Sequence, residues 1–195
     1  NNFDLGIRVA RAVGYKDVGF VYSDSSETAF MEFQLTHKCQ LKCIYCELEK
    51  NNPDMTDEIL YRGIDFLFTT RMKNIRLQFF GGEPLLRIDL IKKAVEYINN
   101  INTTTKKDVS LLVSTNGLIV TEELAKYFLK NKIEVIFSLD GSKLTHILNR
   151  PVETWVKDTD DKIYDKLVHN LRLLQRYRVN YFVNFVVDPK RAKFL

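Results

Sequence analysis

Patterns of buried strands alternate with helical patterns along most of this chain, and this alternation constrains the fold more than any other feature. Nearly continuous apolar runs, rich in β-branched and aromatic residues, predict strands at 29–36, 76–81, 109–115, 133–139 and 180–187. Between them, apolar residues recur three and four positions apart and predict helices at 56–70, 88–101, 121–131 and 162–177. The order β(αβ)4 indicates an α/β fold with a parallel sheet that is buried on both faces.

Two architectures are compatible with this order. Right-handed βαβ units build either an open doubly wound sheet or a closed or partial barrel, and periodicity does not distinguish them. Thr56 and Thr121, each followed by two acidic residues, are the predicted N-caps of two helices. In both architectures the functional loops follow the carboxyl ends of the strands, so the residues in those loops are the candidates for function.

Two regions are expected along the chain. Residues 1–28 form an N-terminal preamble, in which the stretch VGFVYSDSSETAF resembles a hairpin that leads into the first strand. Residues 29–195 form the core α/β unit. The polar stretch NNINTTTKKD at 99–108 is predicted to be an exposed loop.

Composition limits the class of protein. The 195 residues are 45% apolar, which is enough for one sizeable soluble domain, and no run approaches the ~18 apolar residues of a membrane span. No secretory leader is present, and clustered cysteines favour a reducing compartment, so we expect a cytoplasmic protein without a membrane partner. The net charge is +4, but the basic clusters are short and lack interleaved aromatic residues, so nucleic-acid binding is not indicated.

All three cysteines lie within eight positions, in the pattern C-x3-C-x2-C directly after the first predicted strand: Cys39, Cys43 and Cys46. Disulfides join cysteines in pairs, whereas three thiolates from one loop can hold three irons of a cubane cluster and leave the fourth open to a small molecule. A zinc site completed by His37 and free buried thiols are the alternatives. Zinc motifs usually come as two separated knuckles, and His37 is only two residues before Cys39, so the cluster is favoured.

The loop after the second predicted strand contains GGEP, residues 81–84. Together with CQLKCIYC, in which an aromatic residue precedes the last cysteine, it resembles the radical S-adenosylmethionine (SAM) superfamily over about residues 32–189. The resemblance implies a partial (β/α)6 barrel, of which this chain covers five strands. It also implies a [4Fe-4S] cluster ligated by Cys39, Cys43 and Cys46, with SAM bound to the fourth iron. Such enzymes cleave SAM reductively to a 5′-deoxyadenosyl radical that abstracts hydrogen from a substrate.

The resemblance also assigns roles in the first two loops. Gly81 and Gly82 permit close backbone approaches that other residues do not, and Glu83 and Pro84 fix the turn. The family implies that this segment contacts the amino group of SAM and that Tyr45 packs near the adenine. Without the cysteines, GGEP would be interpreted as a plain turn before a helix, and Tyr45 as a packing residue.

Small polar side chains end the third and fourth predicted strands, in STNG and SLDG. Ser114, Asn116, Ser138 and Asp140 can hydrogen-bond a polar ligand there, although both segments also suit ordinary turns. SLDG followed by SKLTHILNR resembles the S-L-D-G-x4-H-D-x2-R segment of the peptide- and protein-modifying SPASM-type branch of the family. That branch includes ribosomal peptide maturases and anaerobic sulfatase-maturating enzymes.

In that branch the serine and the arginine of this segment bind the carboxylate and ribose end of SAM. The resemblance therefore implies this role for Ser138 and Arg150, since a guanidinium is a natural bidentate partner of a carboxylate. The alternative for Arg150 is a surface residue that caps a loop before Pro151. Ile147 replaces the usual aspartate after the histidine, so His146 is expected to be structural.

The branch normally continues through a sixth strand into a cysteine-rich SPASM or twitch extension, but no cysteine follows Cys46. We expect that this extension is absent from the chain, that the C-terminal end is truncated, and that the substrate-side catalytic residues lie outside it.

These observations predict a radical SAM enzyme, an oxidoreductase that modifies a peptide or protein, for example in ribosomal peptide (RiPP) maturation. The expected partners are a peptide or protein substrate and a reducing electron donor of the flavodoxin or ferredoxin type. Two alternatives remain open: a radical SAM enzyme acting on a small molecule or RNA, and a non-enzymatic zinc-stabilised α/β binding module.

Overall fold

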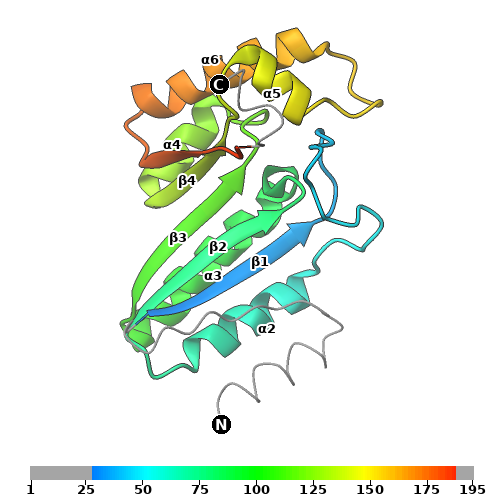
Figure 1. Cartoon of the computed structure of the whole chain (residues 1–195). Coiled ribbons are helices and arrows are strands. Elements are labelled where there is room, and N and C mark those ends of the chain that lie inside the picture. The colour runs from blue at the N-terminus through cyan, green and yellow to red at the C-terminus, as the bar shows by residue number, and fades with distance from the viewer. Residues whose placement is uncertain (1–27, 188–195) are drawn as a thin grey trace.

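The computed structural model describes residues 28–187, which form a parallel sheet with the strand order β1-β2-β3-β4-β5. The strands are β1 (Thr28–Thr36), β2 (Asn74–Gly81), β3 (Asp108–Thr115), β4 (Ile133–Ser138) and β5 (Tyr181–Asn184). Every neighbouring pair is parallel, and the spatial order follows the chain order. A doubly wound sheet reverses its strand order midway, so this order is that of a partial barrel (Figure 1).

Helical segments connect the strands. They are α2 (Asp57–Phe68), the 3-10 turn η1 (Pro84–Arg87), α3 (Ile88–Thr105), α4 (Glu122–Lys130), α5 (Lys143–Asn149) and α6 (Asp160–Arg176). The two predicted N-caps are confirmed, because the hydroxyls of Thr56 and Thr121 accept the amides of Ile59 and Leu124 at 3.3 and 3.2 Å.

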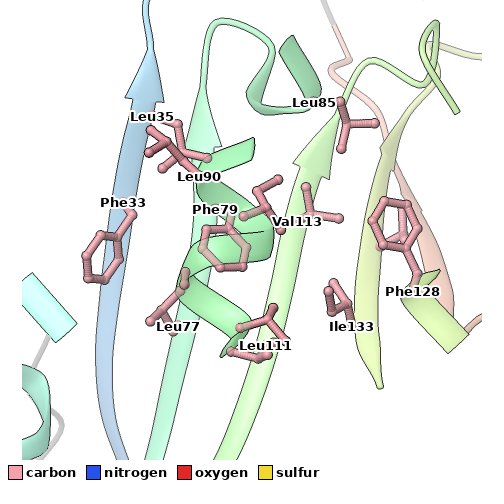
Figure 2. Close-up of a cluster of buried hydrophobic side chains, with 14 of the residues drawn as sticks. Phe33, Leu35, Leu77, Phe79, Leu85, Leu90, Leu111, Val113, Phe128 and Ile133 are labelled. Carbon is pink, nitrogen blue, oxygen red and sulfur yellow. The ribbon is translucent and has the colours of Figure 1, made fainter. Parts of the chain in front are cut away.

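The core lies between one face of the sheet and the helices. Alternate strand residues such as Phe33, Phe79 and Val113 are buried on this face with apolar residues of α2, α3, α4 and α6. Figure 2 shows Phe79 and Val113 of neighbouring strands close to Leu90 of α3. Because the strands follow one another in order, each right-handed connection returns on the same side of the sheet.

The opposite face of the sheet is open within residues 28–187. Glu32 and Arg76 are exposed and Phe80 is half-buried, so the prediction of strands buried on both faces is wrong for this face. The physical reason is the barrel order, which gathers the helices on one side and leaves the other side as the barrel interior. Strand β5 lies at the edge of the described sheet, where Phe182 is 46% exposed and Val183 39% exposed.

Other expectations are corrected locally. Helix α3 runs to Thr105, so the first part of 99–108 is helical and not a loop; it ends at Lys106 in the left-handed conformation with φ 53°. Helix α5 is not among the predicted helices. The hairpin expected in 1–28 lies outside the described residues. Within residues 28–187, no helix is long and apolar enough to cross a membrane.

Candidate functional site

The loops that follow the strands meet at the carboxyl edge of the sheet, as the sequence predicted. The cysteine loop, residues 37–56, follows β1; GGEP follows β2, STNG ends β3, and SLDG ends β4. Strand β1 shifts its register against β2 between Gln34 and Thr36, just before the cysteine loop begins. This irregularity lies where the chain leaves the sheet for the loop.

The three cysteines differ in burial. Cys39 and Cys43 are half-buried and Cys46 is exposed, and all three are free thiols. The Sγ atom of Cys39 accepts the Leu41 amide at 3.4 Å and the Asn116 Nδ2 at 3.5 Å. The Cys46 amide donates to the Cys43 carbonyl oxygen at 3.0 Å and closes a tight turn. The loop therefore presents three sulfur donors at one edge of the sheet, which is the donor set that iron–sulfur clusters use.

Burial keeps the protons on the Cys39 and Cys43 thiols in the absence of a metal. Burial raises the pKa of the Cys39 thiol to about 11. Burial also raises the pKa of the Cys43 thiol, although the nearby positive charge of Arg150 partly lowers it. Metal binding requires thiolates, so loading of a cluster releases these protons.

The zinc alternative depended on His37 as a fourth ligand. The His37 Nδ1 atom lies 2.8 Å from the Glu49 carbonyl oxygen, an arrangement that leaves Nε2 as the ring nitrogen for any metal. Within residues 28–187, no three histidine, cysteine, aspartate or glutamate side chains gather as ligands of a single metal ion. The thiolates of a cubane cluster bind different irons and do not converge on one point.

The cysteine loop is fastened to a segment that lies more than a hundred residues further along the chain. Leu41 and Val152 form an antiparallel bridge, and the Lys42 and Ile44 amides each donate to the segment 149–153 at 2.9 Å. Lys50 forms an ion pair with Glu153. The loop therefore depends on the chain after α5 for its shape.

The GGEP segment is packed against the start of the cysteine loop. The Gly82 amide donates to the Thr36 carbonyl and the Glu83 amide to the Lys38 carbonyl, both at 2.8 Å. A Cβ atom at Gly82 would collide with the carbonyl oxygens of His37 and Lys38, and one at Gly81, where φ is 136°, would collide with Thr36. The close approach predicted for these glycines is thus an approach to the cysteine loop.

Glu83 is fully buried and joins the ends of β2 and β3. Its Oε1 accepts the Thr115 hydroxyl at 2.7 Å and the Leu85 amide at 3.0 Å, and its Oε2 accepts the Asn116 amide at 2.7 Å. Burial raises the pKa of the Glu83 carboxyl to about 7, even though the three donors favour its charged form. Glu83 therefore fixes the loops by hydrogen bonds, while Pro84 begins η1.

Asp140 is the second buried carboxylate of the site and lies just after β4. Its oxygens accept the Tyr45 hydroxyl, the Asn149 amide group at 3.4 Å and the Val186 amide at 3.1 Å. Arg150 lies 3.0 Å from it through both Nε and Nη2. These partners surround the carboxylate, which is 0% exposed, so in this structure Asp140 binds protein groups.

Arg150 is buried beside the cysteine loop. It is 7% exposed, which excludes the alternative of a surface arginine, and its guanidinium lies 5.4 Å from the centre of the Tyr45 ring. A guanidinium has five N–H donors, so donors beyond the Asp140 pair are available in principle to a carboxylate. His146 is buried and its Nδ1 accepts the Asp140 amide at 3.2 Å, as expected of a structural histidine.

Ser114 and Ser138 lie on the open face of the sheet. Both are half-buried, and each pairs in register with a strand neighbour, Ser114 with Ile136 and Ser138 with Asn184. Asn116 instead turns toward the cysteine loop, where its Nδ2 reaches Cys39 and also Gln40 Oε1 at 3.2 Å.

Sequence reasoning missed several polar residues of the open face. Gln78 donates to Glu32 at 3.2 Å, and Arg76 lies 3.4 Å from Glu134. The Nε2 atom of Gln34 is buried and has no hydrogen-bond partner among the described residues, which is the condition of a donor that a ligand can satisfy. The signal was present, because polar residues alternate with apolar ones in Glu32 to Leu35 and in Arg76 to Phe79.

Most of this chain is similar to known proteins. The Radical SAM superfamily model matches residues 33–190. The uncharacterized protein MJ0907 of Methanocaldococcus jannaschii is 31% identical over 163 residues, which is 83% of this chain and 54% of that protein. A cysteine-type anaerobic sulfatase-maturating enzyme of Clostridium novyi is 28% identical over 167 residues, or 80% of this chain and 43% of that enzyme. The chain thus spans about half the length of these relatives.

Solved structures are similar to this chain in both fold and sequence. Native anSMEcpe with bound AdoMet superposes with a TM-score of 0.74 at 27% identity, over 85% of this chain and 45% of that one. The same protein with AdoMet and the Cp18Cys peptide gives a TM-score of 0.74 at 26% identity, over 86% of this chain and 45% of that one.

A shorter match points to another kind of relative. A probable GTP 3′,8-cyclase of Methanocaldococcus jannaschii is 36% identical over 104 residues, which is 51% of this chain and 32% of that protein.

Proposed function

Because the chain belongs to the radical SAM superfamily, we propose that it abstracts hydrogen from a peptide or protein substrate and so modifies it after translation. The chain is an enzyme of a family that uses a [4Fe-4S] cluster and SAM. When bound, the reduced cluster would supply the one electron that cleaves SAM to methionine and a 5′-deoxyadenosyl radical. The protein's part is to hold, orient and shield them.

The cluster is assigned to Cys39, Cys43 and Cys46. The support is the position of the three sulfur donors in one loop, at the edge of the sheet where the open face begins. The fastening of this loop to residues 149–153 would keep the donors in place when the cluster is bound or lost.

SAM is assigned to the open face beside this loop. Ser114 and Ser138 provide hydroxyl groups there, Gly81 and Gly82 provide carbonyl oxygens, and the Tyr45 ring is half-buried at the rim. Arg150 is assigned to the SAM carboxylate, with Asp140 holding the guanidinium in place. The unpartnered Gln34 Nε2 lies on the same face as Ser114 and marks the face as one that accepts a polar ligand.

The peptide substrate rests on one observation: the similarity, at 26% identity and a TM-score of 0.74, to a solved structure that holds the Cp18Cys peptide together with AdoMet. The open face, with polar pairs such as Gln78 with Glu32, offers hydrogen-bonding groups to a peptide backbone. Since the chain spans about half of its relatives, we place further substrate contacts and the substrate-side catalytic groups in a longer protein.

The remaining expectations stay proposals. We place the preamble at 1–28 and the core at 29–195, and we assign reduction to a flavodoxin or ferredoxin type of donor in the cytoplasm. The exposed Cys46 gives an electron carrier a short path to the proposed cluster.

The test is a reaction under anaerobic conditions with reconstituted protein, dithionite and SAM. The Cp18Cys peptide is added to one sample and GTP to a second sample. We expect 5′-deoxyadenosine in both, with a change in the mass of the peptide only. A folded, iron-loaded protein that forms 5′-deoxyadenosine but changes no peptide, in this assay or against a library of cysteine- and serine-containing peptides, would overturn the peptide assignment.

A second candidate is a radical SAM enzyme that acts on a nucleotide. It is favoured by the 36% identity to a probable GTP 3′,8-cyclase, although over only 51% of this chain. Consumption of GTP in the second sample would select it.

A further inference from the structure

We propose that Asn116 is a positioning residue for the cluster and that its side chain makes the cluster easier to reduce. The inference goes beyond the proposed function, because it requires the cluster but no particular substrate. It begins from the 3.5 Å contact between Asn116 Nδ2 and Cys39 Sγ.

The orientation of the Asn116 amide is determined by its neighbours. Its Oδ1 accepts the Leu118 amide at 3.0 Å, so the NH2 group must occupy the other position. That NH2 group faces Cys39 Sγ and Gln40 Oε1, which lies 3.2 Å away and can only accept in this contact. The Leu118 hydrogen bond by itself therefore determines that the NH2 group faces the sulfur, and the Gln40 contact agrees with this orientation.

The backbone of Asn116 is fixed as well. Its amide donates to Glu83 Oε2 at 2.7 Å, and the residue is 6% exposed. Glu83 in turn accepts the Thr115 hydroxyl at 2.7 Å. The side chain is thus held at the end of β3 by a buried carboxylate that belongs to the loop after β2.

Hydrogen bonds to cluster sulfurs are one of the determinants of reduction potential. An N–H group that points at a thiolate stabilises negative charge on it, and reduction adds one negative charge to the cluster. The Leu41 amide provides a second donor to the same sulfur at 3.4 Å, but a side-chain substitution does not remove it. Asn116 is therefore the donor whose effect can be measured.

The experiment is a redox titration of the reconstituted full chain, monitored by electron paramagnetic resonance, in which wild type is compared with Asn116→Leu. The leucine has a similar volume and lacks the donor. We expect the ratio of reduced to oxidised cluster at a fixed applied potential to fall about tenfold, which corresponds to a shift of about 59 mV to more negative values for a one-electron couple. Iron content per chain is measured in the same samples.

Gln40→Ala is the matched control. It removes the other acceptor of the Asn116 amide and leaves the donor to Cys39 in place, so the potential should stay at the wild-type value. If Asn116→Leu fails to fold, Asn116→Asp replaces it, since it keeps an oxygen for the Leu118 amide and has no N–H group.

For Asn116→Asp a second readout separates the hydrogen bond from the added charge. After exchange into D2O, pulsed magnetic resonance of the reduced cluster should show one deuterium coupling in wild type that Asn116→Asp lacks. An unchanged potential in a cluster-loaded Asn116→Leu, or an unchanged deuterium coupling in Asn116→Asp, would overturn the proposal.

Discussion

Two buried carboxylates lie in the loops after β2 and β4, and they are held by different chemistry. Glu83, after β2, accepts hydrogen bonds from neutral groups, namely the Thr115 hydroxyl and the Leu85 and Asn116 amides. Burial raises its pKa to about 7. The ends of β2 and β3 are therefore joined around a group that can change its charge near neutral pH.

Asp140, after β4, is instead ion-paired. Burial alone would raise its pKa, but Arg150 and the Tyr45 hydroxyl hold the pKa of Asp140 below its ordinary value. The comparison teaches that the two loops do different work. The loop after β4 keeps the Asp140–Arg150 ion pair where SAM is proposed to bind, and the loop after β2 positions the cysteine loop by hydrogen bonds between neutral groups and Glu83. Substitutions can separate these two roles.

The largest effect is expected at the ion pair. Asp140→Ala leaves the Arg150 guanidinium buried without its partner, and loss of one member of a buried pair costs about 3–5 kcal/mol of unfolding free energy. Urea unfolding measures this cost. In the double variant Asp140→Ala with Arg150→Met the cost should be smaller than the sum of the single costs, and strictly additive costs would contradict the pairing.

The second effect is a pH dependence at Glu83. Its pKa rises from 4.5 in the unfolded chain to about 7 in the fold, so its contribution to stability is complete below pH 4.5 and is lost as the pH rises through 7. Relative to Glu83→Gln, wild type should lose about 3 kcal/mol between pH 4.5 and pH 7.5.

Urea unfolding of both proteins across this range provides the measurement. Buried His146, whose pKa is lowered to about 4, acts in the opposite direction in both proteins and cancels in the difference. If the difference in unfolding free energy between the two proteins were constant from pH 4.5 to pH 7.5, Glu83 would be charged over this whole range.

A smaller effect is expected where GGEP meets the cysteine loop. Gly82→Ala places a Cβ against the carbonyl oxygens of His37 and Lys38, which must move, at a cost of about 1–3 kcal/mol. Since Lys38 precedes Cys39, reconstituted iron per chain should also fall. Gly63→Ala is the control, because its Cβ would meet the Phe33 ring in the core and leave the loop alone. Equal iron content in the two variants would mean that Gly82 does not determine the shape of the cysteine loop.

The smallest effect is expected at the surface fastening of the loop. Lys50→Ala removes the ion pair with Glu153, and such partly exposed pairs contribute under about 1 kcal/mol. The thermal midpoint should therefore shift only slightly, and it should shift less in 1 M salt. A large loss of stability would mean that this ion pair, and not the backbone bonds to 149–153, fixes the loop.

The sequence predicted the order of strands and helices, since apolar periodicity reports which face of an element is buried. Periodicity could not choose between a barrel and a doubly wound sheet, because that choice depends on which strands become neighbours. The resemblance carried by the cysteine and GGEP motifs implied the partial barrel, and the strand order confirms it. The prediction that the strands are buried on both faces is wrong, because Glu32 and Arg76 are exposed. The residues on the helix-covered face are apolar enough by themselves to make the strands resemble fully buried ones. Helix α5 was not predicted, because a segment of seven residues is too short to show a helical period.

Within the site, motif positions were predicted better than roles. The cysteine, glycine and SLDG segments do meet at one edge, because parallel strands bring their carboxyl ends together. The structure also shows that Asp140 and Asn116 bind protein groups and that Gly82 faces the cysteine loop. These features depend on side-chain directions and long-range contacts, which no local sequence pattern encodes.

The central claim is that Cys39, Cys43 and Cys46 hold a cluster that cleaves SAM. The most direct test uses protein reconstituted without oxygen, reduced with dithionite and given SAM, in wild type and in a variant with all three cysteines replaced by alanine. The account predicts iron and 5′-deoxyadenosine in wild type and neither in the variant. Retained stoichiometric iron or 5′-deoxyadenosine in the variant, or zinc in place of iron in wild type, would contradict it.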